Sequence, residues 1–199
     1  NLAYEILKKN PLFEIEYEPM VPVNNKKPDF RIVGSNLLLY IQVKRMRKSE
    51  DYERQMEENP DSALWYLVDD ESQIHKALNK ACEFQPPEED ALYFIAQEIT
   101  FKANTGDITH SQAVYGKEQF DLSSGRCISR DKNGFFYTPN GQRLYAYITL
   151  RRSNNLHVFG NYEKNIFINP RFYQRKEILS ALLDFDVIYD EKSLPNPLS

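Results

Sequence analysis

The order of predicted elements indicates an α/β protein with a mixed central sheet flanked by helices. Apolar residues recur with the helical period in some segments and alternate or run together in others, which separates helices from strands. The predicted order is a helix, three strands in a meander, a second helix and a fourth strand, then a strand pair and a last helix. With 199 residues, the chain has the usual length of a single domain.

The first helix is expected at Leu2–Lys9 and ends at Asn10-Pro11, because proline disfavours a helical residue before it. A strand follows in which apolar residues alternate with glutamates, which predicts one buried face and one wet face. The buried face comprises Phe13, Ile15 and Tyr17, and the wet face comprises Glu14, Glu16 and Glu18.

Two further strands are expected at about Asp29–Val33 and Leu37–Lys44, with a turn at Gly34–Asn36 between them. The second strand is almost continuously apolar as far as Val43, which suits a central strand covered on both faces. A helix at Ser72–Phe84 shows apolar residues on one face. The strand Ala91–Ile99 then completes a core over about residues 2–99.

The rest of the chain, about residues 100–190, is expected to extend this core within one domain. Residues 102–142 predict a helical turn or two near Ser111–Val114, loops and a hairpin. Strands are predicted at Leu144–Leu150 and Leu156–Tyr162, and a helix at Arg171–Phe185. The aromatic residues near Phe135-Phe136 are expected in the core, and His75 on the surface of its helix.

Composition excludes several classes of protein. Hydrophobic residues make up 41% and charged residues 27%, as in ordinary globular chains. No apolar run approaches the ~20 residues that span a bilayer, and no signal peptide is visible, so we expect a cytoplasmic protein without a membrane partner. The two cysteines fit a reducing compartment, and three widely spaced histidines argue against a zinc site. The net charge of -4 argues against indiscriminate coating of nucleic acid but permits a local basic groove.

The two strands around the Gly34–Asn36 turn carry three polar residues of chemical interest. Strand parity places Gln42 and Lys44 on one face of the second strand. An antiparallel pairing in which residue numbers sum to 71 sets Asp29 beside Gln42. A carboxylate, an amide oxygen and the Val43 carbonyl are the oxygen ligands that Mg²⁺ prefers. A lysine beside them can hold a water molecule or neutralise charge on a phosphate oxygen.

Pro28-Asp29 followed by Gln42-Val43-Lys44 resembles the signature of the PD-(D/E)xK nucleases, the restriction-endonuclease-like family. The order of elements over Leu2–Ile99 is also similar to the core of that family. The resemblance implies that Asp29 is a metal ligand, Gln42 the second ligand position and Val43 a backbone ligand. It further implies that Lys44 is the catalytic lysine and that the cofactor is Mg²⁺ or Mn²⁺.

Two further positions follow from the same resemblance. Glu5 matches an acidic residue of the family's first helix, which is often a further metal ligand, and Gln73 could support the site or contact the substrate backbone. One departure concerns Gln42, which replaces the acid that the signature prefers and removes a unit of negative charge. At ~4 Å and an effective dielectric near 20, one pair of unit charges is worth about 4 kcal/mol.

Each residue also has a plain structural interpretation. Asp29 alone suits a turn, and Lys44 alone suits a solvated strand end, whereas Gln42 interrupts an apolar strand where its amide needs a partner. The basic run beyond Lys44 is either a phosphate-binding edge or a solvated cluster balanced by nearby glutamates. Its candidate nucleic-acid-binding residues are Arg45, Arg47 and Lys48.

The sequence therefore predicts a metal-dependent nuclease that acts on DNA, and a homodimer is compatible with it. The first alternative is a catalytically inactive member of the same fold that binds nucleic acid or a protein partner, with Asp29 and Lys44 forming a plain ion pair. The second alternative is a structural domain in which the basic run is ordinary surface.

Overall fold

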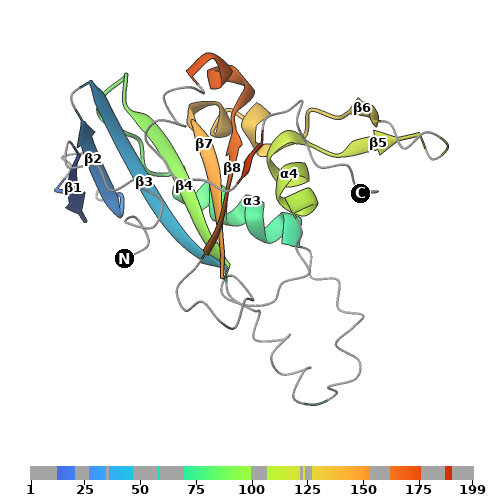
Figure 1. Cartoon of the computed structure of the whole chain (residues 1–199), viewed down its shortest axis with the longest axis horizontal. Coiled ribbons are helices and arrows are strands. Elements are labelled where there is room, and N and C mark those ends of the chain that lie inside the picture. The colour runs from blue at the N-terminus through green and yellow to red at the C-terminus, as the bar shows by residue number, and fades with distance from the viewer. Residues whose placement is uncertain are drawn as a thin grey trace.

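The computed structural model of the chain describes residues 13–20, 27–34, 36–46, 58, 70–99, 107–121, 123, 127–152, 162–175 and 187–189. These residues form an α/β fold around a seven-stranded sheet with strand order β1-β2-β3-β4-β7-β8-β9 (Figure 1). The expectation of an α/β protein with a mixed central sheet is confirmed. The strands of this sheet are β1 (Glu14–Tyr17), β2 (Phe30–Gly34), β3 (Leu37–Met46), β4 (Leu92–Ile99), β7 (Ala146–Arg152), β8 (Tyr162–Ile168) and β9 (Val187–Tyr189).

The sheet is antiparallel at its start and parallel in its centre. Strands β1, β2 and β3 form the predicted meander, whereas β3 pairs with β4 in parallel over the register Leu39↔Leu92 to Met46↔Ile99. β4 pairs with β7 in parallel, β7 with β8 antiparallel, and β8 with β9 in parallel. The parallel β3–β4 pair requires a crossover connection, and helix α3 (Asp70–Ala81) lies within it.

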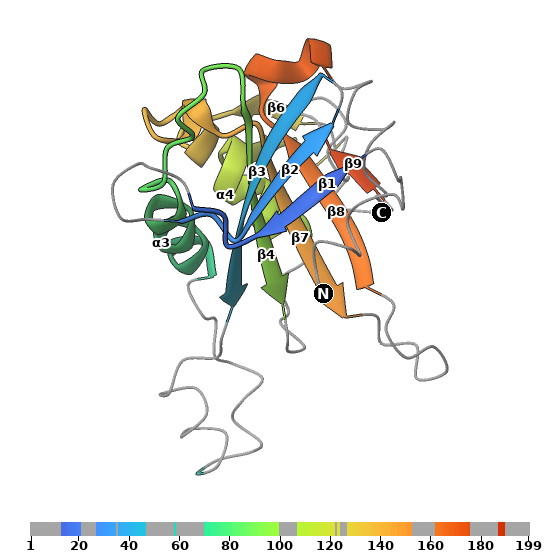
Figure 2. The same cartoon turned by 90° about the vertical axis from the view of Figure 1, so that its left-hand side faces the viewer.

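Two helices cover one face of the sheet, namely α3 and α4 (Asp107–Tyr115) (Figure 2). Ile74, Leu78 and Ala81 of α3 are fully buried, as the helical spacing predicts. They pack against Tyr40 of β3 and the aromatic residues of β4 and β7. The opposite face buries a second cluster around Ile41 and Phe94, so β3 and β4 are covered on both sides.

Three short 3₁₀ helices and a small hairpin complete the described residues. The hairpin is β5 (Glu118–Phe120) and β6 (Cys127–Arg130), and it projects from the side where α4 lies (Figure 1). The 3₁₀ helices are η2 (Phe135–Tyr137), η3 (Gly141–Arg143) and η4 (Pro170–Arg175). Among the described residues, no helix is both long and apolar enough to cross a membrane.

Part of the second half of the chain differs from expectation. The strand that pairs with β7 is β8, with Ala146↔Ile168 and Arg152↔Tyr162, whereas the predicted partner was Leu156–Tyr162, of which only Tyr162 lies within the described residues. This later segment pairs with β7, and its residues Ile166, Phe167 and Ile168 are all buried in the two faces of the core. The predicted helix at Arg171–Phe185 begins instead as the 3₁₀ turn η4, and the strand β9 was not predicted.

Other predicted segments either fall outside the described residues or differ in length or burial from the prediction. The expected first helix at Leu2–Lys9 lies outside the described residues. α4 is longer than the turn or two predicted near Ser111–Val114. Tyr17 was expected on a buried face but is 61% exposed, because β1 is an edge strand whose end lies beyond the covered core.

The buried face of α3 leads to a test of this architecture. Leu78→Ala should lower the free energy of unfolding by about 2–5 kcal/mol, because the side chain is fully buried between α3 and the sheet. Urea denaturation measures the change. Lys80→Ala, an exposed position on the same helix, is the matched control and should change stability by less than about 0.5 kcal/mol. Similar small effects at both positions would contradict the packing of α3 on this face.

Candidate functional site

Asp29 and Gln42 lie side by side where β2 begins. Phe30 pairs with Ile41, so the register sums to 71 as predicted and sets Asp29 opposite Gln42. The Gln42 amide nitrogen donates a hydrogen bond to Asp29 Oδ2. The backbone nitrogen of Val43 donates to the same oxygen at 2.6 Å. The structure therefore brings together three of the predicted site residues.

The backbone around Asp29 is held from both neighbouring strands. The Asp29 nitrogen donates to the Ile41 carbonyl at 3.1 Å, and the Glu18 nitrogen donates to the Asp29 carbonyl at 2.9 Å. Glu18 adopts the left-handed conformation with φ 47°, which is uncommon for a residue other than glycine. These bonds fix the position of the carboxylate relative to β3.

Several oxygen atoms at this point are left for a ligand. Within the described residues, neither Asp29 Oδ1 nor Gln42 Oε1 accepts a hydrogen bond. The N–H of Val43 points toward β2, and in a strand the carbonyl of the same residue points the same way. A carboxylate, an amide and a backbone carbonyl thus gather in one place.

This oxygen set has the right chemistry for Mg²⁺, although its charge is low for one. Asp29 is the one carboxylate of the set, and no cluster of three acidic, histidine or cysteine side chains occurs in the described part of the chain. Glu5, the further ligand implied by the resemblance, lies outside the described residues. Glu18 stands opposite Asp29 across β1 and β2, and a hydrogen bond to its carboxylate, followed by its charge, raises the pKa of the exposed Tyr17.

Lys44 lies two residues beyond Gln42 on the same face of β3 and is half-buried. Its register partner on β4 is Gln97. Arg45 forms an ion pair with Glu98 at 2.8 Å, with 58% of the arginine side chain exposed. Arg47 and Lys48 lie outside the described residues. Gln73 sits half-buried in the first part of α3 and forms no hydrogen bond with Asp29 or Gln42 among the described residues.

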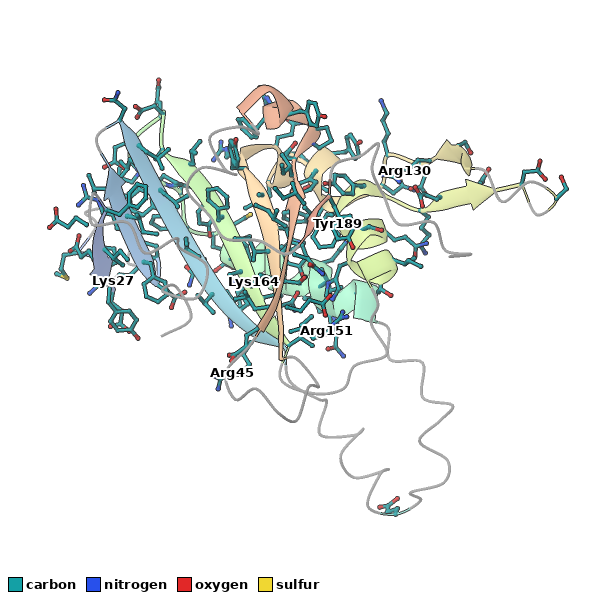
Figure 3. The ribbon with its side chains drawn as sticks, viewed as in Figure 1. Lys27, Arg45, Arg130, Arg151, Lys164 and Tyr189 are labelled. Carbon is teal, nitrogen blue, oxygen red and sulfur yellow. The ribbon has the colours of Figure 1, made fainter. Side chains whose placement is uncertain are left out.

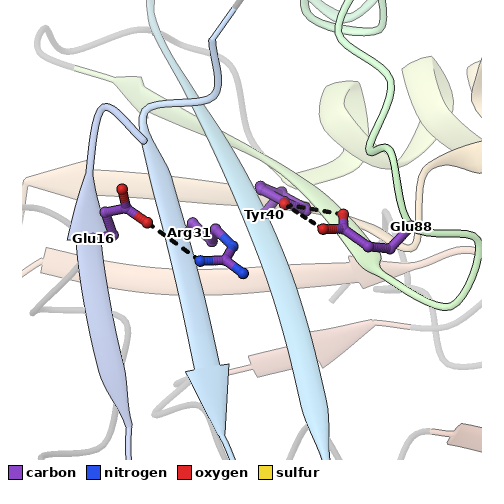
Figure 4. Close-up of polar contacts among 4 residues, drawn as sticks. All are labelled: Glu16, Arg31, Tyr40 and Glu88. Atoms are coloured by element: carbon purple, nitrogen blue, oxygen red, sulfur yellow. Dashed lines mark hydrogen bonds and ion pairs between the residues drawn. The ribbon is translucent and has the colours of Figure 1, made fainter. Parts of the chain in front are cut away.

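A second row of polar residues crosses the sheet one step from Asp29 and Gln42. Arg31 and Tyr40 are register partners on β2 and β3, and they share the face of Gln42 by parity. The Arg31 guanidinium pairs with Glu16 at 3.4 Å, while the Tyr40 hydroxyl donates to the Glu88 carboxylate at 3.0 Å (Figure 4). Burial, and then the hydrogen bond to Glu88, raises the pKa of Tyr40. This row anchors the loop before β4 onto the hairpin.

Sequence reasoning missed a buried polar network under α4. Gln97, Tyr147 and His110 are each at most 2% exposed. The Tyr147 hydroxyl donates to Gln97 Oε1, and it lies 2.9 Å from His110 Nδ1. The available signal was the same as for Gln42, since Gln97 interrupts the apolar strand β4. His110 carried no such signal, because its depth depends on how α4 packs.

The proton positions in this network follow from the chemistry of each group. An amide oxygen only accepts, so the Tyr147 proton points to Gln97 and the Tyr147 oxygen accepts from His110 Nδ1. His110 Nε2 is then a bare acceptor, and it has no partner within the described residues. Burial, followed by the positive charge of Arg151, lowers the pKa of His110 to about 3. The imidazole is therefore neutral near pH 7.

Other titratable groups near the core are structural. Burial raises the pKa of the Cys82 thiol to about 12, which keeps it protonated and unreactive. Burial, followed by the charges of Cys82 and Asp29, raises the pKa of Tyr93, whose hydroxyl donates to the Ala81 carbonyl at 2.7 Å. The prediction that His75 is a surface residue is wrong, because it is half-buried with Nε2 2.7 Å from the Ala113 carbonyl of α4. The expectation that the aromatic residues near Phe135 belong to the core is confirmed.

Comparisons with protein-family models, with curated proteins and with solved structures found no match to this chain.

Removing the Asp29 carboxylate should destabilise the hairpin. Asp29→Ala leaves the Val43 N–H and the Gln42 amide without their acceptor, and should lower the free energy of unfolding by about 1–3 kcal/mol. Asp29→Asn retains an acceptor oxygen, so its loss should be smaller. Chemical denaturation measures both, with Glu16→Ala on the exposed ion pair as control. Equal stability of Asp29→Ala and the control would show that the carboxylate does not hold β3.

The neutral state of buried His110 should make stability depend on pH. Its folded pKa of about 3 lies below the unfolded value near 6.5, so the unfolded state binds more protons between these values. Stability should fall as pH decreases, by roughly 2 kcal/mol between about pH 7.5 and about pH 5 from this residue alone.

The matched variant for this pH effect is His110→Asn, whose amide nitrogen can replace ring Nδ1 as the donor to Tyr147. Denaturation at both pH values, compared between the two proteins, isolates the histidine from carboxylates that they share. An unchanged pH dependence in His110→Asn would contradict the assignment of a neutral buried imidazole.

Proposed function

We propose that this chain is a metal-dependent nuclease that hydrolyses phosphodiester bonds in DNA at a site built by Asp29, Gln42 and Lys44. The observation that carries the proposal is the direct contact of the Asp29 carboxylate with both the Gln42 amide and the Val43 backbone. Lys44 follows on the same face of β3. A carboxylate, an amide oxygen and a backbone carbonyl beside a lysine suit a phosphodiester better than any other common substrate.

The arrangement of elements also supports this proposal. The resemblance of Pro28-Asp29 and Gln42-Val43-Lys44 to the PD-(D/E)xK signature implies that the aspartate opens one strand and the lysine follows on its neighbour. Asp29 directly precedes β2, and Lys44 lies near the end of β3, the next strand of the meander. The crossover through α3 to a fourth strand agrees with the order expected from the same resemblance.

In this proposal Asp29, Gln42 and the Val43 carbonyl hold Mg²⁺ or Mn²⁺, and Glu5 provides a second carboxylate. When bound, such an ion lowers the pKa of a coordinated water and neutralises charge on the phosphate. The single carboxylate among the described ligands, next to the positive Lys44, makes this a weak site, since one missing charge at ~4 Å corresponds to about 4 kcal/mol at an effective dielectric near 20. We therefore expect cleavage to need a high concentration of metal.

The remaining residues act on the substrate. Lys44 positions the attacking water or neutralises a phosphate oxygen, because an ammonium group has three donors and a full charge. We assign contact with the DNA backbone to Arg45, Arg47, Lys48 and Gln73. Arg45 is already paired with Glu98, so its contribution is smaller than that of a free guanidinium.

The direct test is incubation of the purified chain with labelled duplex and single-stranded DNA in the presence of Mg²⁺ or Mn²⁺. Asp29→Asn and Lys44→Met should each lower the cleavage rate by at least about a hundredfold, because each removes a group that acts on the reacting phosphate. Glu16→Gln on the neighbouring exposed row is the matched control and should keep full activity. Cleavage that survives both Asp29→Asn and Lys44→Met would overturn the assignment of this site.

A second candidate function is a nucleic-acid-binding module of the same fold without catalysis. The observation that favours it is the hydrogen bond of Gln42 to Asp29, which already satisfies one carboxylate oxygen without any metal. This candidate is supported by DNA binding that weakens with salt, with no cleavage and no effect of Mg²⁺ on the thermal stability of the chain. Metal-dependent stabilisation that Asp29→Asn abolishes would favour the nuclease instead.

A further inference from the structure

Gln97 lies on β4 directly beside Lys44 of β3. The two are register partners in the parallel β3–β4 pair, so their side chains leave the same face of the sheet. Neighbouring strands are about 4.8 Å apart, a distance that a glutamine or lysine side chain spans easily. Gln97 is 2% exposed, and the residues before it on β4, from Leu92 to Ala96, are all apolar and buried. A polar side chain at this point therefore needs an explanation.

One end of the Gln97 amide is fixed by the network under α4. Gln97 Oε1 accepts the Tyr147 proton, and His110 Nδ1 in turn donates to the Tyr147 oxygen. Tyr147 and His110 are fully buried, so neither can move without repacking the core. Tyr147, held by His110, therefore determines the orientation of the Gln97 amide plane.

The other end of the amide, Nε2, has no acceptor in the part of the chain that the structure describes. Among the described residues, Gln97 Nε2 donates no hydrogen bond, and it does not belong to the polar atoms that are sealed from solvent. A buried amide usually satisfies its donors, since an unmade hydrogen bond costs free energy. Two fully buried polar residues thus hold an N–H₂ group that has no acceptor among the described residues.

We propose that Gln97 is a substrate-contact residue, whose amide nitrogen donates a hydrogen bond to a phosphate oxygen of a nucleic-acid strand bound beside Lys44. Tyr147 and His110 are positioning residues for this contact. The inference rests on the proposed function, because the phosphate is the one that the Asp29–Gln42–Lys44 site would bind. It extends that site from the β2–β3 hairpin onto the next strand of the sheet.

The surroundings of Gln97 fit a phosphate. Gln97 lies near the carboxyl end of β4, and ligands of parallel sheets bind at the carboxyl ends of the strands. Arg151 of β7 lies at this same end and, by strand parity, on the same face as Gln97, whereas Arg45 of β3 leaves the opposite face (Figure 3). Phosphate groups accept hydrogen bonds from neutral amides as well as from cations, and such contacts fix the register of the strand.

The experiment compares Gln97→Met and Gln97→Glu with the parent chain, using the same labelled DNA with Mg²⁺ or Mn²⁺. Methionine keeps the volume without a donor, while glutamate keeps the acceptor for Tyr147 and replaces the N–H₂ group with an oxygen. At about pH 8 both should reduce cleavage, or DNA binding if the chain does not cleave, by about tenfold or more. Gln142→Glu, an exposed glutamine in η3, is the matched control with the same charge change and should be unaffected.

Two further readouts separate contact from structure. At about pH 5.5, Gln97→Glu should recover relative to Gln97→Met, because a buried carboxyl group keeps its proton and becomes a donor again. Tyr147→Phe should weaken the parent chain by about threefold to tenfold but add nothing in the Gln97→Met background, since Tyr147 acts through Gln97. Urea denaturation of each variant checks that the loss is not unfolding.

The outcomes distinguish this inference from the function on which it rests. If the parent chain acts on DNA and Gln97→Met behaves like Gln142→Glu, the substrate contact is overturned and the nuclease proposal stands. If Gln97→Met weakens activity while Tyr147→Phe adds a full further loss to it, the positioning role is overturned. If the parent chain neither binds nor cleaves DNA with either metal, both the proposed function and this inference fail.

Discussion

The parallel pairing of β3 with β4 is the constraint on which the rest of this fold depends. A parallel pair cannot be closed by a tight turn, so the chain must leave the sheet after β3 and return to the opposite end. That excursion includes α3, whose apolar face then covers the sheet. Because both strands sit in the interior of the sheet, they also need cover on the second face, where the cluster around Ile41 and Phe94 forms.

The same pairing explains where the polar residues gather. Along β3, β4 and β7, apolar side chains fill the first part of each strand under the helices, and polar side chains follow at about the same level. They are Gln42 and Lys44 on β3, Gln97 on β4 and Thr149 on β7, and the register places Lys44, Gln97 and Thr149 next to one another. Each is buried or half-buried, so the protein and not bulk solvent surrounds most of each side chain. The polar row at the carboxyl ends of these strands is therefore a product of strand direction and register.

Features of the fold that depend on contacts between residues close in sequence could be predicted, and those that depend on contacts between distant segments could not. The β2–β3 hairpin was predictable to its register, because a short turn and a period of two leave little choice in how Phe30 meets Ile41. The partner of β7 was not, because two apolar segments follow it and only the filling of both core faces selects the later one, Tyr162–Ile168. The same limit applied to the site. Asp29 beside Gln42 is a local consequence of the hairpin, whereas the approach of His110 to Tyr147 depends on the packing of α4 against a distant strand.

Gln42 connects the stability of the hairpin to its chemistry. An acidic residue at this position would place two carboxylates in contact, and their repulsion would oppose pairing of β2 with β3 unless a cation lay between them. The amide instead donates to Asp29 Oδ2, so the hairpin holds its register without a cation. Val43 N–H adds a second donor to the same oxygen, which fixes the position of the carboxylate. Under the proposed function, a metal ion would bind through the oxygens that accept neither of these two hydrogen bonds. A glutamine at this position therefore lets the hairpin hold Asp29 through a hydrogen bond, so the fold of the site does not depend on the metal ion of the proposed function.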